Sequence, residues 1–265
     1  MEIILIHSFK GGAGKTTISV NLANQLAIEK NKKVLLIETD FKMPSFFGVF
    51  PKIKPEYYLN DFYSEKPISL EKCIVPLNEK LDIIMAKPDV NPAEPVHSWD
   101  KKWHASHLKR LRQELTNIKK KDLYDFILFD TPPGVHFIVL NNIALASKAF
   151  VVVRPNSMAV EGTKNMIENW YFKTKSPSRL KVYVVFNQIP RVPMTAELDQ
   201  WNKEFKEIKV NESARVPCSC DGVYQMARGE NLFAPSHEIN RFLSPVFSIL
   251  LNEEIIKIPD PTIEF

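Results

Sequence analysis

Residues 10–17 carry the most specific chemistry in this sequence. They read Lys10-Gly11-Gly12-Ala13-Gly14-Lys15-Thr16-Thr17 and directly follow the apolar run Ile3–Ile6. Glycines let backbone N–H groups curl around phosphate oxygens, a lysine meets the β- and γ-phosphates, and a hydroxyl holds Mg²⁺. A helix that begins near Thr16 would direct its N-terminus at the same anion. We therefore expect a phosphate-binding loop in which Lys15 contacts phosphate and Thr16 the metal.

Two acidic strand ends supply candidate partners for the metal. The apolar segment 34–37 leads to Glu38 and Asp40, and the segment 126–129 leads to Asp130. In open parallel sheets, ligands bind at the carboxyl ends of the strands. Carboxylates there hold Mg²⁺ directly or through water. We expect Thr16, Asp40 and Asp130 to form the metal site, although Glu38 and Asp40 could instead cap a turn.

The loop departs from the general phosphate-binding pattern, which would place its first glycine at Phe9. The observed Lys-Gly-Gly-x-Gly-Lys-Thr-Thr resembles the signature of the ParA/MinD family of ATPases. Asp130-Thr131-Pro132-Pro133-Gly134 is similar to the second switch of that family. Segment 41–45 resembles its first switch, and segment 59–62 resembles the stretch after that switch. The resemblance covers most of residues 1–250.

That resemblance implies a mechanism and its parts. ATP and Mg²⁺ would bind between two subunits of a homodimer, and Lys10 would reach the ATP of the partner subunit. Lys10, Lys15 and Asp40 would be catalytic, with Asp40 matching the second acid of the family's Asp-x-Asp. Glu38 replaces the first acid. Hydrolysis would be slow alone and stimulated by a partner protein.

The base-binding end rests on two residues. The strand 182–186 ends at Asn187, whose amide offers the donor and the acceptor that an adenine edge requires. An asparagine at a strand end is also a common turn residue. The family carries an asparagine at this place, and a loop that flanks the base where Pro217 stands here. Asn187 and Pro217 are therefore expected nucleotide contacts.

Alternating strands and helices predict the fold. Continuous apolar runs indicate strands buried on both faces, near 2–8, 33–38, 81–86, 125–130, 149–154 and 181–187. Helices are expected near 15–30, 106–119, 138–147, 158–174, 196–207, 220–228 and 238–254. This order predicts an α/β, doubly wound, mostly parallel sheet with helices on both faces. We expect a single domain over 1–265.

Composition excludes several classes. Three cysteines in 265 residues make a disulfide framework improbable and favour a reducing compartment. There is no charged, apolar secretion leader and no run of about 20 apolar residues, so no transmembrane segment is expected. These features predict a cytoplasmic protein.

Basic residues favour a polyanion partner. The family's small members bind DNA without sequence preference, so Lys173, Lys175, Arg179, Lys181 and Arg191 are candidate DNA contacts on a nucleoid-associated protein. A second cluster lies within 101–121, and both could be simply solvated surface. No helix-turn-helix precedes the loop. The leading expectation is a plasmid or chromosome partition ATPase with a ParB-like activator.

Two alternatives stay open. Cys218 and Cys220 could share a metal across a dimer, as in a metallochaperone or an iron–sulfur or nickel assembly ATPase, although their spacing is Cys-x-Cys. A MinD-like protein that acts at a membrane in division-site placement is the other. The acidic, proline-broken stretch 252–261 disfavours it, because MinD-like proteins end in a basic amphipathic helix.

Overall fold

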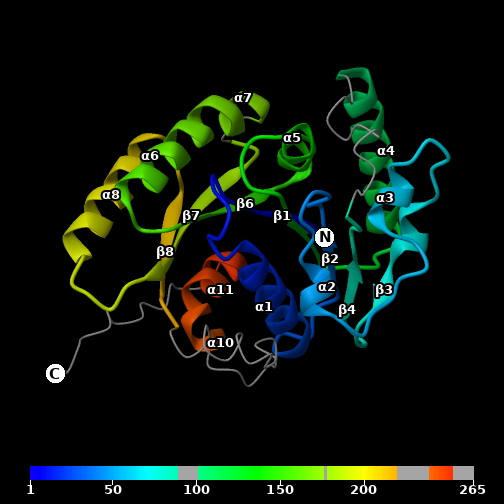
Figure 1. Ribbon diagram of the computed structural model, residues 1–265, viewed down its shortest axis with the longest axis horizontal. Helices are drawn as coiled ribbons and strands as arrows, with labels where there is room; N and C mark the ends of the chain where they lie inside the picture. The colour runs from blue at the N-terminus through cyan, green and yellow to red at the C-terminus, as the bar shows by residue number, and fades with distance from the viewer. Residues whose placement is uncertain (89–100, 176–177, 220–238, 253–265) are drawn as a thin grey trace.

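The computed structural model describes residues 1–88, 101–175, 178–219 and 239–252, which build one sheet covered by helices (Figure 1). Within these ranges the sheet has eight strands in the order β3-β4-β2-β5-β1-β6-β7-β8. All neighbouring pairs are parallel except β3 and β4. The chain starts at the centre of the sheet, winds to one edge and then returns to build the other half. The strands are β1 (Glu2–His7), β2 (Val34–Glu38), β3 (Val75–Pro76), β4 (Leu81–Ile84), β5 (Phe126–Asp130), β6 (Lys148–Val153), β7 (Lys181–Ile189) and β8 (Glu212–Pro217).

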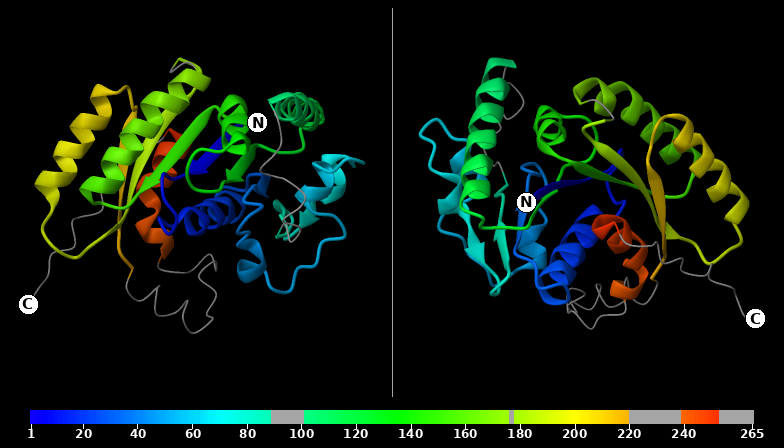
Figure 2. Two further views of the ribbon diagram at one scale, coloured as in Figure 1. Left: turned by 45° about the horizontal axis from the view of Figure 1, so that its top comes forward. Right: turned by 180° about the vertical axis from the view of Figure 1, so that it is seen from behind.

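Helices cover both faces of the sheet. Figures 1 and 2 both place α1 and α11 side by side on one face and α5, α6 and α8 on the other. The helices are α1 (Lys15–Ile28), α2 (Phe46–Val49), α3 (Leu59–Phe62), α4 (Lys101–Lys120), α5 (Phe137–Leu145), α6 (Ser157–Met166), α7 (Phe172–Thr174), α8 (Thr195–Glu207), α10 (Ile239–Phe242) and α11 (Ser244–Leu251). A 3₁₀ turn spans Leu70–Cys73, and a π-helical stretch, Ile167–Tyr171, joins α6 to α7.

Two apolar clusters fill the space between the sheet and its helices. The alternation of side chains along each strand divides the apolar residues between the faces, so that Leu5 packs on one side and Ile4 and Ile6 on the other. Helix α4 contributes Leu111, Leu115 and Ile118 at the spacing of one helical face. Burial on both faces explains why the central strands are continuous apolar runs.

The predicted α/β, mostly parallel, doubly wound sheet is confirmed, and all six predicted strands are present. The edge strands β3 and β8 and the short helices α2 and α3 were missed. The helix expected over 158–174 contains the π-helical stretch, and the one over 238–254 is divided into α10 and α11. Helix α4 begins before the predicted residue 106, and the helix expected over 220–228 lies outside the described residues.

The edge strands escaped prediction for a physical reason. Strand β3 has only two residues, and in β8 the buried Ala214 and Val216 alternate with half-buried neighbours. An edge strand has a hydrogen-bonded neighbour on one side only, so it needs no continuous apolar run. Its position is decided by pairing with β4 or β7, which is a tertiary property.

Candidate nucleotide site

The loop between β1 and α1 has the backbone that phosphate binding requires. Gly12 and Gly14 have φ angles of +72° and +92°, which L side chains rarely adopt. Gly14 caps the N-terminus of α1, so the helix dipole is directed at the loop. A Cβ atom at Gly14 would lie 2.3 Å from Nδ2 of Asn187. Glycine is therefore required at position 14 by both conformation and space.

The two lysines of the loop lie in different environments. Lys15 is 8% exposed, and burial lowers the pKa of its ammonium while Asp130 and Asp40 raise it. Lys10 is exposed, and its Nζ lies 3.1 Å from the sulfur of Met158. Among the described residues, no carboxylate is paired with Lys10. Lys15 is thus held inside the site and Lys10 is presented at its surface.

Thr16 and Asp130, both predicted metal ligands, are hydrogen-bonded to each other. Oγ1 of Thr16 donates to Oδ2 of Asp130 at 2.7 Å, although 114 residues separate them. Burial raises the pKa of Asp130 to about 6, and the bond from Thr16 and the charge of Lys15 oppose this rise. The other oxygen, Oδ1, is buried without a hydrogen bond to any residue that the structure describes. A buried carboxylate oxygen of this kind fits a cation such as Mg²⁺, which prefers oxygen ligands.

Asp40 lies at the rim of the same site. Its Oδ1 accepts a hydrogen bond from the backbone N–H of Met43 at 3.0 Å, and its charge acts on both Lys15 and Asp130. The preceding Thr39 is buried and bonded through its backbone and its hydroxyl to the carbonyl of Asp130. The ends of β2 and β5 are therefore joined, and Asp40 is half-buried next to the loop. Its role as metal ligand and catalyst stays a prediction.

Glu38 is a structural acid in this chain. It is fully buried, and its Oε1 accepts hydrogen bonds from the backbone N–H groups of Ser45 and Phe46. Its Oε2 accepts from the N–H of Ala86 at 3.1 Å. Burial raises the pKa of Glu38 to about 7, and these three backbone bonds oppose the rise. The turn-capping alternative therefore holds for Glu38, which ties the start of α2 to the segment after β4.

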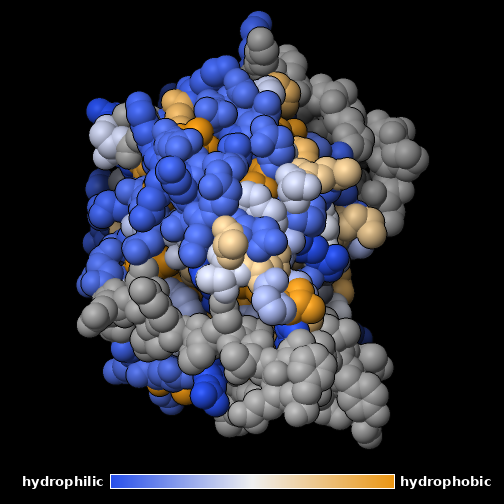
Figure 3. Space-filling model, turned by 90° about the vertical axis from the view of Figure 1, so that its left-hand side faces the viewer, coloured by the Kyte–Doolittle hydropathy of each residue, from blue (hydrophilic) through white to orange (hydrophobic). Residues whose placement is uncertain are grey.

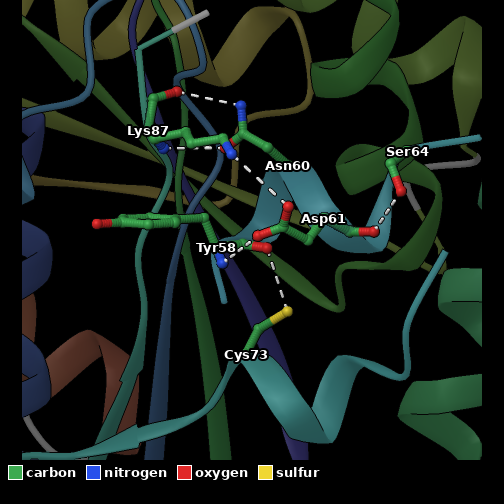
Figure 4. Close-up of polar contacts among 6 residues, drawn as sticks. All are labelled: Tyr58, Asn60, Asp61, Ser64, Cys73 and Lys87. Atoms are coloured by element: carbon green, nitrogen blue, oxygen red, sulfur yellow. Dashed lines mark hydrogen bonds and ion pairs between the residues drawn. The ribbon is translucent and has the colours of Figure 1, made fainter. Parts of the chain in front are cut away.

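Segment 58–64 is anchored to the residues that follow β4 (Figure 4). Asn60 exchanges two hydrogen bonds with the backbone of Lys87, at 2.9 and 3.1 Å. Lys87 also pairs with Asp61, whose other oxygen accepts from the N–H of Tyr58. The thiol of Cys73 donates to the carbonyl of Tyr58 at 3.2 Å. Together with Glu38, these contacts fix segment 45–62 to the end of β4.

Asn187 lies directly below the loop. Its Nδ2 donates to the carbonyl of Ala13 at 2.7 Å, so the amide braces the loop. Strand β7 has an irregularity between Asn187 and Ile189, where Gln188 adopts a positive φ of 61°. Such bulges reorient a neighbouring side chain. Pro217 ends β8 opposite Ile189, beside Asn187. Contact of Asn187 and Pro217 with a base stays a prediction.

A buried imidazole at the end of β1 contacts the turn that follows β5. Nε2 of His7 lies 2.8 Å from the carbonyl of Gly134, and Nδ1 lies 2.6 Å from the hydroxyl of Tyr171. Gly134 has a φ of +74°, which glycine adopts without strain. Burial lowers the pKa of His7 to about 3, so the ring is neutral, with Nε2 as donor. No motif in the sequence had pointed to this histidine.

The candidate DNA contacts are not one cluster. Lys173, Lys175, Arg179 and Lys181 lie at or before the start of β7, whereas Arg191 follows its end. Eight steps of about 3.3 Å put roughly 26 Å of strand between these two ends. Lys175 also donates to the carbonyls of Ala144 and Ala146 at the end of α5. The length of β7 therefore separates Lys181 from Arg191, and contact of these residues with DNA stays a prediction.

Two alternatives from the sequence, a metal site at Cys218 and Cys220 and action at a membrane, can be compared with the structure. Cys218 is half-buried after β8, and Cys220 lies outside the described residues. Within the described part, no three His, Cys, Asp or Glu side chains gather in a way that could hold a metal ion. The helices of that part also lack the combination of length and apolar character that a membrane span needs. The surface over α6 and α8 is mostly hydrophilic (Figure 3).

Three features of the site had weak or no signals in the sequence. Ser45 follows Pro44 and lies 3.1 Å from the hydroxyl of Thr16, a contact that no motif announced. Arg154 follows β6, and a Cβ at Gly12 would lie 3.9 Å from its guanidinium. His7 was visible only as a polar residue at the end of an apolar strand.

Comparison with known proteins agrees with this geometry. The model of the AAA domain family matches residues 1–181. The chain is 30% identical to the chromosome-partitioning ATPase Soj of Treponema pallidum over 167 residues, which are 60% of this chain and 59% of Soj. It is also 30% identical to the septum site-determining protein MinD of Synechocystis over 169 residues, 63% of this chain and 58% of MinD. The chain thus spans about three fifths of the length of these relatives.

A solved structure extends the likeness to nearly the whole chain. A variant of McdA from Cyanothece in complex with ATP superposes with a TM-score of 0.72 at 16% identity, covering 97% of this chain and 99% of that one. At this identity the likeness concerns the fold.

Proposed function

This chain belongs to the AAA domain family and, within it, to the ParA/MinD ATPases with the deviant phosphate-binding loop, and from this we propose that it is a Mg²⁺-dependent ATPase for partition or intracellular positioning. ATP would close two subunits face to face, and hydrolysis would release them. DNA would be the track along which the dimer acts, and a ParB-like protein would stimulate hydrolysis.

One observation carries the proposal: the loop has two lysines with opposite exposure. Lys15 is buried among the acids of its own site, where it would bind the phosphates of its own nucleotide. Lys10 is exposed next to Met158, with a thioether as its polar neighbour. Since a thioether is a weak acceptor, an oxyanion from another subunit would compete for this ammonium easily. Two such loops facing each other would each lend a lysine to the opposite nucleotide.

The remaining residues would position and stabilise charge, which is the main task in phosphoryl transfer. Thr16 and Asp130 would hold Mg²⁺, which supplies positive charge at the phosphate oxygens. Asp40, half-buried at the rim, would orient the attacking water. The segments anchored at Glu38 and Gly134 would change conformation when the γ-phosphate is lost. This change would weaken the contacts between the two subunits and loosen the dimer.

The test is binding to non-specific duplex DNA with ATP, with ADP and without nucleotide, at two salt concentrations, with dimerisation followed by light scattering. We expect dimers and DNA binding with ATP only, weakened by salt because phosphate contacts release counterions. Lys10→Ala should abolish both, whereas Lys203→Ala, which removes an exposed lysine from α8, should leave both intact. A monomer in saturating ATP would refute the proposal.

The alternative is that the ATP-bound dimer acts on a membrane surface and not on DNA, because the sequence identity to MinD equals that to Soj. Co-sedimentation of the ATP-bound dimer with vesicles of anionic lipid separates the two. Retention on vesicles and not on DNA would favour a MinD-like function. Stoichiometric zinc, nickel or iron in the purified dimer, lost when Cys218 and Cys220 are both changed to serine, would instead favour the metallochaperone function.

A further inference from the structure

The hydroxyl of Ser45 lies where a further ligand of the metal would be. Its Oγ is 3.1 Å from Oγ1 of Thr16, which is itself 2.7 Å from Oδ2 of Asp130. Mg²⁺ binds six oxygens at about 2.0–2.1 Å in near-ideal octahedral geometry, so neighbouring ligands lie about 2.9 Å apart. The distance of 3.1 Å between the two hydroxyl oxygens is close to this spacing. Ser45 and Thr16 are therefore spaced as two ligands of one small cation are, with Asp130 behind Thr16 as its hydrogen-bond acceptor.

The two hydroxyls can offer lone pairs to the same cation. Thr16 donates its proton to Asp130 at 2.7 Å, and the hydroxyl of Ser45 lies within hydrogen-bond distance of Oγ1 of Thr16 at 3.1 Å and of Oε1 of Glu38 at 3.3 Å. Each hydroxyl has one proton and two lone pairs, so when Ser45 donates to Glu38 both oxygens keep lone pairs that face the cation. Hydroxyls that ligate a metal while donating to a carboxylate behind them have this arrangement.

Glu38 holds Ser45 in this place through the backbone as well. The N–H groups of Ser45 and Phe46 both bond to Oε1 of Glu38, and Oε2 is bonded to the N–H of Ala86. The position of Ser45 is thus set from two separate segments of chain and does not depend on the serine hydroxyl. Removing only that hydroxyl leaves three backbone bonds to Glu38 intact.

From this geometry we infer that Ser45 is a protein ligand of the Mg²⁺ that accompanies the nucleotide, next to Thr16, and that Glu38 is the residue that positions it. The inference rests on the proposed function, since it concerns the same site. It makes Ser45 a direct sensor of the metal: release of Mg²⁺ removes the metal-mediated link between Ser45 and Thr16, whereas the backbone of Ser45 and Phe46 stays bonded to Glu38.

The experiment titrates Mg²⁺ into the full-length protein with a fluorescent, non-hydrolysable ATP analogue. The readout is the Mg²⁺ concentration that half-restores high analogue affinity. We expect Ser45→Ala to raise this concentration about 10-fold or more, the effect of losing a metal-site partner. The affinity measured in EDTA should stay unchanged. Ser64→Ala, which removes a hydroxyl that donates to the Asp61 carbonyl, is the matched control.

A second variant tests direct ligation. Ser45→Cys offers a soft sulfur, which disfavours Mg²⁺ and favours Cd²⁺, so it should lose affinity with Mg²⁺ and recover it with Cd²⁺. An Mg²⁺ requirement within twofold of wild type in Ser45→Ala, or equal recovery of alanine and cysteine variants by Cd²⁺, would overturn the inference. If the wild-type chain binds the analogue neither with nor without Mg²⁺, the proposed function itself fails instead.

Discussion

Replacing His7 should change how the stability of this protein depends on pH. The ring is fully buried between Gly134 and Tyr171, and burial lowers its pKa from 6.5 to about 3. Between these two values the unfolded chain binds a proton that the folded chain does not. Stability from this group is therefore complete above pH 6.5 and is lost as the pH falls toward 3.

The size of the effect follows from the two pKa values. At pH 4.5 an unfolded histidine with a pKa of 6.5 is about 99% protonated, so protonation favours the unfolded state by a factor of about 100, or about 2.7 kcal/mol. At pH 7.5 the same contribution is about 0.1 kcal/mol. Because pH 4.5 lies well above the folded pKa, the result depends almost entirely on the unfolded value.

Urea unfolding of wild type and His7→Asn, without nucleotide at pH 7.5 and 4.5, measures the effect. Carboxylates such as Glu38 titrate in both proteins, so comparing the two cancels their contributions. The free-energy gap between wild type and variant should narrow by about 2.7 kcal/mol on going to pH 4.5. Tyr171→Phe is the control: it removes a hydrogen bond but keeps the imidazole, so it should retain the wild-type pH dependence. A gap that does not change with pH would refute the assignment of a buried neutral ring.

Three further predictions concern Gly14 in the loop, Glu38 and helix α11. Gly14→Ala should weaken nucleotide binding at least 10-fold, because its φ is +92° and this left-handed conformation alone costs an L residue about 1–2 kcal/mol. Gly48→Ala is the control and should bind nucleotide normally, because a Cβ at Gly48 meets open space. Equal affinities of the two variants in a fluorescence titration would contradict the loop geometry. From pH 5 to pH 8 the free energy of unfolding of wild type should fall by about 2–3 kcal/mol relative to that of Glu38→Gln. The pKa of Glu38 is raised from 4.5 to about 7 in the folded state, so its stabilising contribution is complete below pH 4.5 and is lost as the pH rises through 7. Parallel pH profiles of the two proteins in urea unfolding would disprove this. Lys148→Met should lower the free energy of unfolding by about 1.5–3 kcal/mol, because the buried ammonium of Lys148 donates to the carbonyl of Leu250 in α11 at 2.7 Å. An unchanged midpoint of urea unfolding would show that other contacts hold α11.

Much of the site could be predicted because its signals are local. The loop, the apolar strands and the acids that follow them are encoded within short stretches of sequence. Once the strands are taken as parallel, their carboxyl ends meet at one edge, which brings Asp130 to Thr16 across 114 residues. Periodicity and turn chemistry therefore determined the sheet, the position of the site and the pairing of its hydroxyl with its acid.

Other properties were decided only by the tertiary structure. Glu38 is an anchor for α2 because its longer side chain reaches three backbone N–H groups, one of them at Ala86, 48 residues away. Lys181 and Arg191 are close in the sequence, but the length of β7 separates them. Ser45, which precedes the short helix α2, meets Thr16, and no periodicity revealed this helix. In each case the contacts of a residue depend on the length of its side chain or strand and on what packs beside it. These contacts join residues far apart in the sequence, so local sequence patterns do not predict them.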